Sequence, residues 1–371
     1  MSDGRRCPAL APIVAALPAT VPFVGPEAFE RQENFRFRVR LGANESLFGP
    51  SPVVIRAMGE AAHEIQLYGD PEIWDLRTAI GAQHGLNPDH VVVGSGIDEL
   101  LGLFVRAYLA PREIAVMSRG GYPTMVYQLD AHGIAIETVP YRNFRNDGEA
   151  LVEAAWEMGA RLIYLANPDN PTGSWLSAAE QQLMIDRLPE DCLFVLDEAY
   201  AELAPHGALP PVDAGDPRVV RLRTFSKVHG LAGMRVGYAF GSPETIRPID
   251  RIRNQFGVGR MAQAAALAAL ADRGHVERVT AAVDEGRRDY AALAETLGLR
   301  ALPSAANFVA IDVGSGERAR ALVGRLRTEH GVFIRMPGTA PLDRCIRVTV
   351  GRPEDRAIFA EALTAIVRGG G

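Results

Sequence analysis

The chain has 371 residues, of which 47% are hydrophobic and 23% charged, a composition typical of a folded protein long enough for two packed domains. A net charge of −6 and the lack of any basic run argue against binding of nucleic acid. Three widely spaced cysteines fit neither a disulfide framework nor a metal site, which favours a reducing cytoplasm. No apolar run is long enough to span a membrane, and prolines interrupt the short apolar run near the N-terminus, which argues against export.

In chain order, residues 1–40 are rich in proline and are expected to form an irregular arm on another part of the protein. The turn-rich stretch LGANESLFGPSP (41–52) leads into a predicted helix over 52–65. Apolar and helical stretches then alternate, which predicts an α/β domain with a mainly parallel sheet. The strands lack polar alternation, so both faces of the sheet should be covered. Seven strands are predicted, over 91–94, 113–118, 134–140, 161–166, 192–197, 219–224 and 236–241.

The last third of the chain has a different pattern. An alanine-rich helical region covers 261–297 and is broken near Gly274. Short strands and helices follow, over 308–313, 317–330, 345–350 and 353–367. This pattern predicts a smaller α+β domain. We therefore expect an N-terminal arm at 1–45 that packs with the small domain, a large domain at 46–255 and the small domain at 256–371.

Lys227 is the single lysine of the sequence, since all other basic residues are arginines. It lies in TFSKVHGLAGMRVGY (224–238), directly after a predicted strand. A lysine amine can lose its proton and attack a carbonyl carbon, whereas arginine stays protonated. A surface lysine kept by chance is the alternative, and the features that follow neighbouring strands favour the reactive amine.

Several predicted strands end in polar or glycine-rich features, where ligands bind in open α/β sheets. Ser95-Gly96 opens a helix and could hold a phosphate, although a purely structural turn fits equally well. Tyr122, after two glycines, could stack on a flat cofactor or pack in the core. Asn170, in NPDNPTG (167–173), could offer its amide to a ligand or bond its own backbone.

Asp197 ends an apolar strand, and burial of a carboxylate is costly unless a cationic group meets it. A protonated pyridine nitrogen would satisfy this need. The next strand leads to Ser226-Lys227, and Arg235 follows at a position suited to phosphate recognition. The order of these features favours a single cofactor site.

Four ordered motifs carry a family resemblance: NPDNPTG (167–173), DEAY (197–200), Ser226-Lys227 with GLAGMR (230–235), and IRVTVG (346–351). The chain resembles class I/II aminotransferases that depend on pyridoxal phosphate, and above all the histidinol-phosphate aminotransferase group. GSGIDELL (94–101) and the stretch at 41–52 add to the likeness, which spans about residues 40–367. It implies the fold type I architecture, a large domain with a mainly parallel seven-stranded sheet beside a smaller α+β domain.

The resemblance implies roles around the cofactor ring. Lys227 would bind the cofactor as a Schiff base and later move the substrate proton. Asp197 would keep the ring nitrogen protonated, and Asn170 and Tyr200 would hydrogen-bond the ring 3-oxygen. Tyr122 would stack on the ring.

The resemblance also implies which residues would bind the cofactor's phosphate. Ser95, Gly96, Ser226 and Arg235 would hold this group. Tyr68 matches a tyrosine that reaches the cofactor of the other subunit, which implies a homodimer with shared active sites.

Substrate contacts follow from the same resemblance. Arg347 would grip the α-carboxylate, and Arg335 is a second candidate for anion contact. Asn44 is a further candidate, although turn and cap chemistry explains Asn44-Glu45 equally well. The family's usual Asn-Glu-Asn-Pro is here Asn44-Glu45-Ser46-Leu47, and Phe23-Val24-Gly25-Pro26 lacks a tyrosine hydroxyl often found in the arm.

The sequence thus predicts a ping-pong aminotransferase that uses histidinol phosphate, with L-glutamate and 2-oxoglutarate as the other pair. An aromatic amino acid aminotransferase is the nearest alternative, and a decarboxylase of a phosphorylated amino acid is a further one. A cofactor-sensing regulator with an added DNA-binding domain is not favoured, because the aminotransferase pattern begins by about residue 40.

Overall fold

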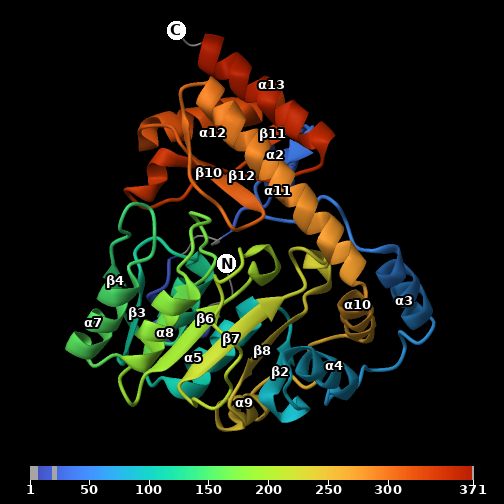
Figure 1. Cartoon of the computed structure of the whole chain (residues 1–371), viewed down its shortest axis with the longest axis vertical. Helices are drawn as coiled ribbons and strands as arrows, with labels where there is room; N and C mark the ends of the chain where they lie inside the picture. The colour runs from blue at the N-terminus through green and yellow to red at the C-terminus, as the bar shows by residue number, and fades with distance from the viewer. Residues whose placement is uncertain (1–6, 19–22, 370–371) are drawn as a thin grey trace, which may run out of the picture.

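A seven-stranded sheet forms the centre of the larger part of the molecule, at the bottom of Figure 1. The structure is a computed structural model that describes residues 7–18 and 23–369. In the order β2-β8-β7-β6-β5-β3-β4, β8 is antiparallel to both neighbours and the other strand pairs are parallel, which confirms the predicted sheet. The strands are β2 (Val91–Gly94), β3 (Ile114–Ser118), β4 (Ala135–Val139), β5 (Leu162–Ala166), β6 (Leu193–Asp197), β7 (Val219–Thr224) and β8 (Gly237–Gly241).

Helices cover both faces of this sheet, as the unalternating strands predict. Leu193 and Val195 of β6 pack on one side with α5, α6 and α9. Phe194 and Leu196 pack on the other side with α7 and α8, because successive side chains of a strand point to opposite faces. These helices are α5 (Ile97–Tyr108), α6 (Pro123–Ala131), α7 (Gly148–Met158), α8 (Ala178–Asp186) and α9 (Pro243–Asp250).

Three more helices cover the end of the sheet formed by β2 and β8. The alanine-rich α10 (Arg260–Ala271) packs against α3 (Pro52–Ala62) and α4 (Trp74–His84), and its alanines join a core with Val91 and Phe240. The Ser51 side chain accepts a hydrogen bond from the Val54 amide and so caps the start of α3. The predicted boundary near residue 255 stays a prediction.

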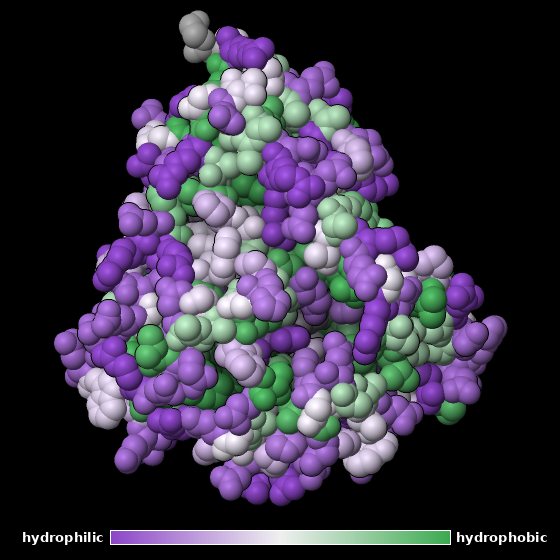
Figure 2. Space-filling model, in the orientation of Figure 1, coloured by the Kyte–Doolittle hydropathy of each residue, from purple (hydrophilic) through white to green (hydrophobic). Residues whose placement is uncertain are grey.

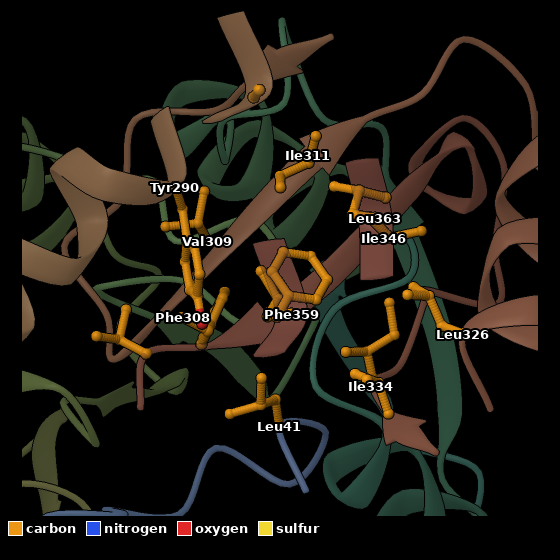
Figure 3. Packing of buried hydrophobic residues seen from close by; sticks show 14 of the residues in the cluster. Leu41, Tyr290, Phe308, Val309, Ile311, Leu326, Ile334, Ile346, Phe359 and Leu363 are labelled. Atoms are coloured by element: carbon orange, nitrogen blue, oxygen red, sulfur yellow. The ribbon is translucent and has the colours of Figure 1, made fainter. Parts of the chain in front are cut away.

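The smaller part of the molecule combines short strands with three long helices, at the top of Figure 1. The break predicted near Gly274 falls at Asp272, whose side chain caps α11. Phe359 lies at the centre of the core in Figure 3, with its ring edge-on to Tyr290. The strands form the antiparallel order β12-β10-β9 and the parallel pair β1-β11. The elements are α11 (Arg273–Thr296), β9 (Arg300–Ala301), β10 (Phe308–Asp312), α12 (Gly316–His330), β11 (Val332–Phe333), β12 (Cys345–Thr349) and α13 (Pro353–Gly369).

The N-terminal arm is more regular than the sequence predicts. It contains α1 (Pro12–Ala15) and α2 (Pro26–Glu33), each with proline in its first turn, where the missing N–H costs nothing. The expectation of an irregular segment was therefore wrong for these residues. β1 (Val39–Arg40) pairs with β11 of the smaller part, and α2 is held by ion pairs from Glu27 and Glu30 to Arg40, both at 2.6 Å.

The face of the molecule drawn in Figure 2 is mostly polar, and the helical turns not yet described are short 3₁₀ turns. Figure 2 shows a largely hydrophilic face on which small groups of hydrophobic residues reach the surface. Within residues 7–18 and 23–369, no helix has the length and apolar character needed to cross a membrane. The 3₁₀ turns are Pro88–His90, Ala201–Leu203, Ala232–Met234 and Leu342–Arg344.

Candidate active site

A cleft of about 880 Å³ lies between the carboxyl ends of the large sheet, the arm and the smaller part of the molecule. Ala166, Asp197 and Thr224 mark the ends of β5, β6 and β7 in its floor. This is where ligands bind in open α/β sheets. Ten of the residues predicted from the sequence line the cleft: Asn44, Tyr122, Asn170, Asp197, Tyr200, Ser226, Lys227, Arg235, Arg335 and Arg347.

Lys227 lies in the turn that follows β7 and points its amine into the cleft. Its Nζ donates a hydrogen bond to the Asn44 carbonyl at 3.1 Å and lies 5.7 Å from the centre of the Tyr200 ring. Burial, and then the nearby charge of Arg347, lower the pKa of Lys227 to about 8. A far larger fraction of this amine is therefore neutral near pH 7 than for an exposed lysine.

Asp197 ends β6 and is 3% exposed. Its Oδ1 accepts from the Ala199 amide at 3.0 Å, and its Oδ2 accepts from the Tyr164 hydroxyl at 2.7 Å. Burial raises the pKa of Asp197 to about 6, against the lowering effect of these two hydrogen bonds. Among the described residues no cationic side chain forms an ion pair with it, so a cationic ligand atom suits this carboxylate.

Asn170 and Arg347 meet across the cleft. Arg347 donates from Nη1 to Asn170 Oδ1 at 2.7 Å and from Nη2 to the Gly42 carbonyl at 3.0 Å. With its oxygen used in this way, Asn170 has its amide N–H groups left to donate. Burial lowers the pKa of Arg347, and the neighbouring charge of Arg335 acts in the same direction.

Asn44 holds Tyr200 and the small-part strand β12 together. Its Nδ2 donates to the Tyr200 hydroxyl oxygen at 3.0 Å, and its Oδ1 accepts from Thr349 at 3.3 Å. Asn44 is buried and has a left-handed backbone (φ 55°), a conformation that asparagine tolerates better than most residues. Both ends of its side chain are thus used within the protein. Because burial raises the pKa of Tyr200 to about 12, the phenol keeps its proton and can donate it to a ligand.

The start of α5 forms one end of the cleft. Asp98 accepts from the Tyr122 hydroxyl at 2.8 Å and from Arg235 at 3.3 Å. Gly96 has φ 86°, and a Cβ there would lie 2.7 Å from Arg235 Nη2, so only glycine fits. Ile97 and Asp98 line the cleft at the first turn of α5, whose N–H groups lack partners within the helix.

Ser95 and Gly96 lie beside the cleft and do not line it. The Ser95 amide donates to Glu99, its hydroxyl donates to the Gly257 carbonyl at 2.8 Å, and the Gly96 amide donates to the Gly94 carbonyl at 2.8 Å. Their predicted phosphate contacts stay predictions.

Tyr68 lies outside the cleft on the loop between α3 and α4. It is 79% exposed, and its ring packs on Phe256 with 4.6 Å between centroids. Arg260 donates to its carbonyl at 2.9 Å. The hydroxyl therefore makes no contact with the cleft of its own chain.

Arg335 connects the cleft to the arm. Its Nη2 donates to the Val24 carbonyl at 2.8 Å, and its guanidinium lies 5.1 Å from the ring centre of Phe23 and 5.4 Å from that of Phe333. Phe23 itself lines the cleft. The arm thus closes one side of the site through Arg335.

Comparison with known proteins identifies the family. The family model described as "Aminotransferase class I and II" matches residues 38–363. The chain belongs to this family. It is therefore an aminotransferase that depends on pyridoxal 5′-phosphate, as the motifs predict.

Individual relatives agree with this assignment. The aminotransferase is 37% identical to a histidinol-phosphate aminotransferase from an Anaeromyxobacter species over 95% of its own length and 98% of the relative. It is 35% identical to one from Moorella thermoacetica, with 92% and 88% covered. A crystal structure of histidinol-phosphate aminotransferase from Sinorhizobium meliloti in complex with pyridoxal-5′-phosphate is 45% identical, covers 98% of both chains and has a TM-score of 0.95.

The cleft of this aminotransferase fits the cofactor. Lys227 supplies an amine with a lowered pKa, and Asp197 supplies a buried carboxylate without a cationic partner among the described residues. At the other end, Arg235, the Ser226 hydroxyl and the first turn of α5 surround a space suited to a phosphate.

Four residues of the site were not predicted from the sequence. Tyr164 and Asp98 contact predicted residues directly, and Thr349 and Asn307 hold Asn44. Thr349 follows Arg347 by two positions on β12, so the period of two in a strand places both on one face. Tyr164 is the polar hydroxyl in an apolar strand that ends beside the site. The strand spacing of Thr349 and the hydroxyl of Tyr164 are therefore sequence features that indicate a place in the site.

Proposed function

We propose that this aminotransferase transfers the amino group between histidinol phosphate and 2-oxoglutarate by a ping-pong mechanism. The three relatives reported above carry the name histidinol-phosphate aminotransferase at 35–45% identity over most of the chain. Within the structure, one observation supports an anionic substrate most directly: the pair of arginines in the wall of the cleft.

Arg335 and Arg347 are held side by side by their backbones. The Arg347 amide donates to the Arg335 carbonyl at 2.7 Å, and the Arg335 amide donates to the Arg347 carbonyl at 3.3 Å. Among the described residues no carboxylate forms an ion pair with either guanidinium, and burial lowers the pKa of both. Two adjacent, partly buried cations attract an anion, and the arginine fork suits a carboxylate or a phosphate. Glutamate carries two carboxylates and histidinol phosphate carries one phosphate.

The floor of the cleft provides the chemistry. Bound pyridoxal phosphate supplies a carbonyl carbon for amines and a ring that withdraws electrons from the substrate. Asp197 would hold that ring by accepting a hydrogen bond from its protonated nitrogen. The Tyr200 hydroxyl accepts from Asn44 and keeps its own hydrogen available. This hydroxyl and the amide N–H groups of Asn170 would donate to the ring oxygen. Lys227 would hold the cofactor through its amine, whose pKa is lowered, and the same amine would accept the substrate proton and return it.

The phosphate end fixes the cofactor during these steps. Arg235, the Ser226 hydroxyl and the N–H groups of Ile97 and Asp98 would bind the phosphate, and Ser95-Gly96 would shape the turn that presents these groups. Tyr122 would stack on the ring, and its hydrogen bond to Asp98 joins this residue to the phosphate end of the cleft. These residues would together hold the cofactor at both ends.

We further propose that the enzyme is a cytoplasmic homodimer. Exposed apolar side chains gather on α3, on the loop after it and near the start of α10, including Ile65, Leu67, Tyr68 and Phe256. Figure 2 shows hydrophobic residues at the surface over this side. Because Tyr68 is 79% exposed and does not line its own cleft, its side chain is accessible to a second copy.

Steady-state transamination tests the substrate. The purified enzyme, loaded with cofactor, is supplied with 2-oxoglutarate and with histidinol phosphate, phenylalanine or tyrosine, and glutamate formation is measured. We expect the highest kcat/KM with histidinol phosphate. A higher kcat/KM with the aromatic amino acids would replace the proposed substrate, and carbon dioxide release without glutamate formation would replace the reaction.

A further inference from the structure

Tyr164 is a buried tyrosine of β5 whose hydroxyl reaches the end of β6. It is 3% exposed and lines the cleft. In the parallel pairing of β5 with β6, Tyr164 lies opposite Val195, and Ala166 lies opposite Asp197. Tyr164 and Asp197 are therefore diagonal neighbours on one face of the sheet, within the reach of an aromatic side chain.

The contact is a hydrogen bond from the Tyr164 hydroxyl to Asp197 Oδ2 at 2.7 Å. The other oxygen, Oδ1, accepts from the Ala199 amide at 3.0 Å, so each carboxylate oxygen has a fixed donor. The carboxylate cannot turn without breaking one of these bonds. Burial raises the pKa of Tyr164 well above its usual value, so the phenol remains the donor. A hydrogen bond to a carboxylate favours its ionised form.

We propose that Tyr164 is a positioning residue, which acts through Asp197 by fixing the orientation and the negative charge of the carboxylate that meets the cofactor ring. This inference rests on the proposed role of Asp197 and is independent of the choice of substrate. A tyrosine that only filled the core would tolerate phenylalanine without any effect on cofactor binding.

Tyr164→Phe removes the hydroxyl and keeps the ring. Cofactor dissociation constants are measured from absorbance and fluorescence for wild type and variant between pH 5.5 and 9. We expect the dissociation constant at pH 7 to rise by about tenfold, the loss typical of one hydrogen bond to a charged group. Removal of the bond raises the pKa of Asp197, so binding weakens at a higher pH than in wild type as the solution is acidified. An unchanged dissociation constant and pH profile would overturn the proposal.

Tyr238→Phe is the matched control. Tyr238 belongs to the same sheet, is also 3% exposed, and its hydroxyl contacts His84 at 3.1 Å, away from the cleft. We expect its cofactor affinity and pH profile to match wild type. Equal weakening in both phenylalanine variants would show a general loss of core packing and overturn the role of Tyr164.

Combination with Asp197→Asn separates the two roles. If Tyr164 acts through Asp197, Tyr164→Phe weakens binding in the wild-type background and has no further effect in the Asp197→Asn background. The same weakening in both backgrounds would show that Tyr164 acts independently and would overturn the inference. If Asp197→Asn itself left binding unchanged, the proposed role of Asp197 would fail first, and the role of Tyr164 with it.

Discussion

The floor and the wall of the cleft are built in different ways. The floor consists of Asp197, Asn170 and Lys227, which lie at or shortly after the carboxyl ends of neighbouring strands of the large sheet. The wall consists of Phe23, Arg335 and Arg347, which come from the arm and from two segments of the smaller part. Asp197 is almost completely buried, whereas Phe23 is 46% exposed.

This difference in construction separates the residues proposed for the chemistry from those proposed to select the substrate. The floor fixes the groups that we propose contact the cofactor, because the sheet sets their spacing and fixed donors set the orientation of the Asp197 carboxylate. The wall would contact the part of the substrate that varies between amino acids and phosphates. It is joined to the arm by hydrogen bonds from Arg335 to Val24 and from Arg347 to Gly42. Changes in the floor should therefore lower kcat, and changes in the wall should mainly alter KM and substrate preference.

The largest effect is expected for the amine of the floor. Lys227→Ala removes both the covalent attachment and the proton carrier, and we expect transamination to fall by about 10⁴-fold or more. Borohydride treatment followed by mass spectrometry should find the cofactor fixed on Lys227 in wild type and on no residue in the variant. Turnover within about tenfold of wild type would contradict the role of the floor, since general acid–base catalysis alone supplies more than that.

The next largest effect is expected in the pH dependence of cofactor capture by Lys227. Cofactor capture needs the neutral amine, and the pKa of Lys227 is lowered to about 8. Capture by the cofactor-free protein should reach its plateau above this pH and slow by about tenfold for each unit below it, since the neutral fraction falls in that proportion. Stopped-flow absorbance measures this rate. A plateau reached only near the pH of an ordinary lysine would show that the cleft does not alter the amine.

The floor was largely predictable from the sequence, and the wall was not. Lys227, Asp197 and Asn170 follow apolar strands in motifs whose spacing is local, so their meeting point follows from a parallel sheet. The contact between Arg347 and Asn170 joins residues that are far apart in sequence. The resemblance named both residues but did not predict that they touch. The regular α2 and the Arg335 contact to Val24 depend on tertiary packing that proline content conceals. For the same reason, the resemblance identified Tyr68 as a candidate residue but did not predict its exposed position beside Phe256.

In the wall, lysine substitutions of Arg347 and Arg335 compare how much each arginine contributes to binding of the anionic substrate. Arg347→Lys keeps the charge and loses the fork, and we expect kcat/KM for glutamate to fall by about thirtyfold, equivalent to about 2 kcal/mol of charge-assisted hydrogen bonding. Arg335→Lys is the matched variant, and a smaller loss is expected because the resemblance assigns the α-carboxylate to Arg347 and gives Arg335 only as a second candidate for anion contact. Equal losses in kcat with an unchanged KM in both variants would contradict the division between floor and wall.

The smallest effect is expected at the arm. Phe23→Ala removes the ring that packs on Arg335, and we expect KM for the phosphorylated substrate to rise by about threefold with kcat nearly unchanged, as for the loss of one exposed cation–π contact. Steady-state kinetics at saturating 2-oxoglutarate measure both constants. A large fall in kcat with an unchanged KM would place the arm in the chemistry instead.

Single-turnover spectroscopy tests the central claim most directly, because it follows each half of the reaction alone. The loaded enzyme is mixed with histidinol phosphate, glutamate, phenylalanine or tyrosine, without any oxo acid, and the loss of the visible cofactor band is recorded. We predict fast and complete conversion with histidinol phosphate and with glutamate, and much slower conversion with the two aromatic amino acids. No conversion with histidinol phosphate, despite conversion with glutamate, would contradict the proposed substrate, and no conversion with any amine would contradict the proposed reaction.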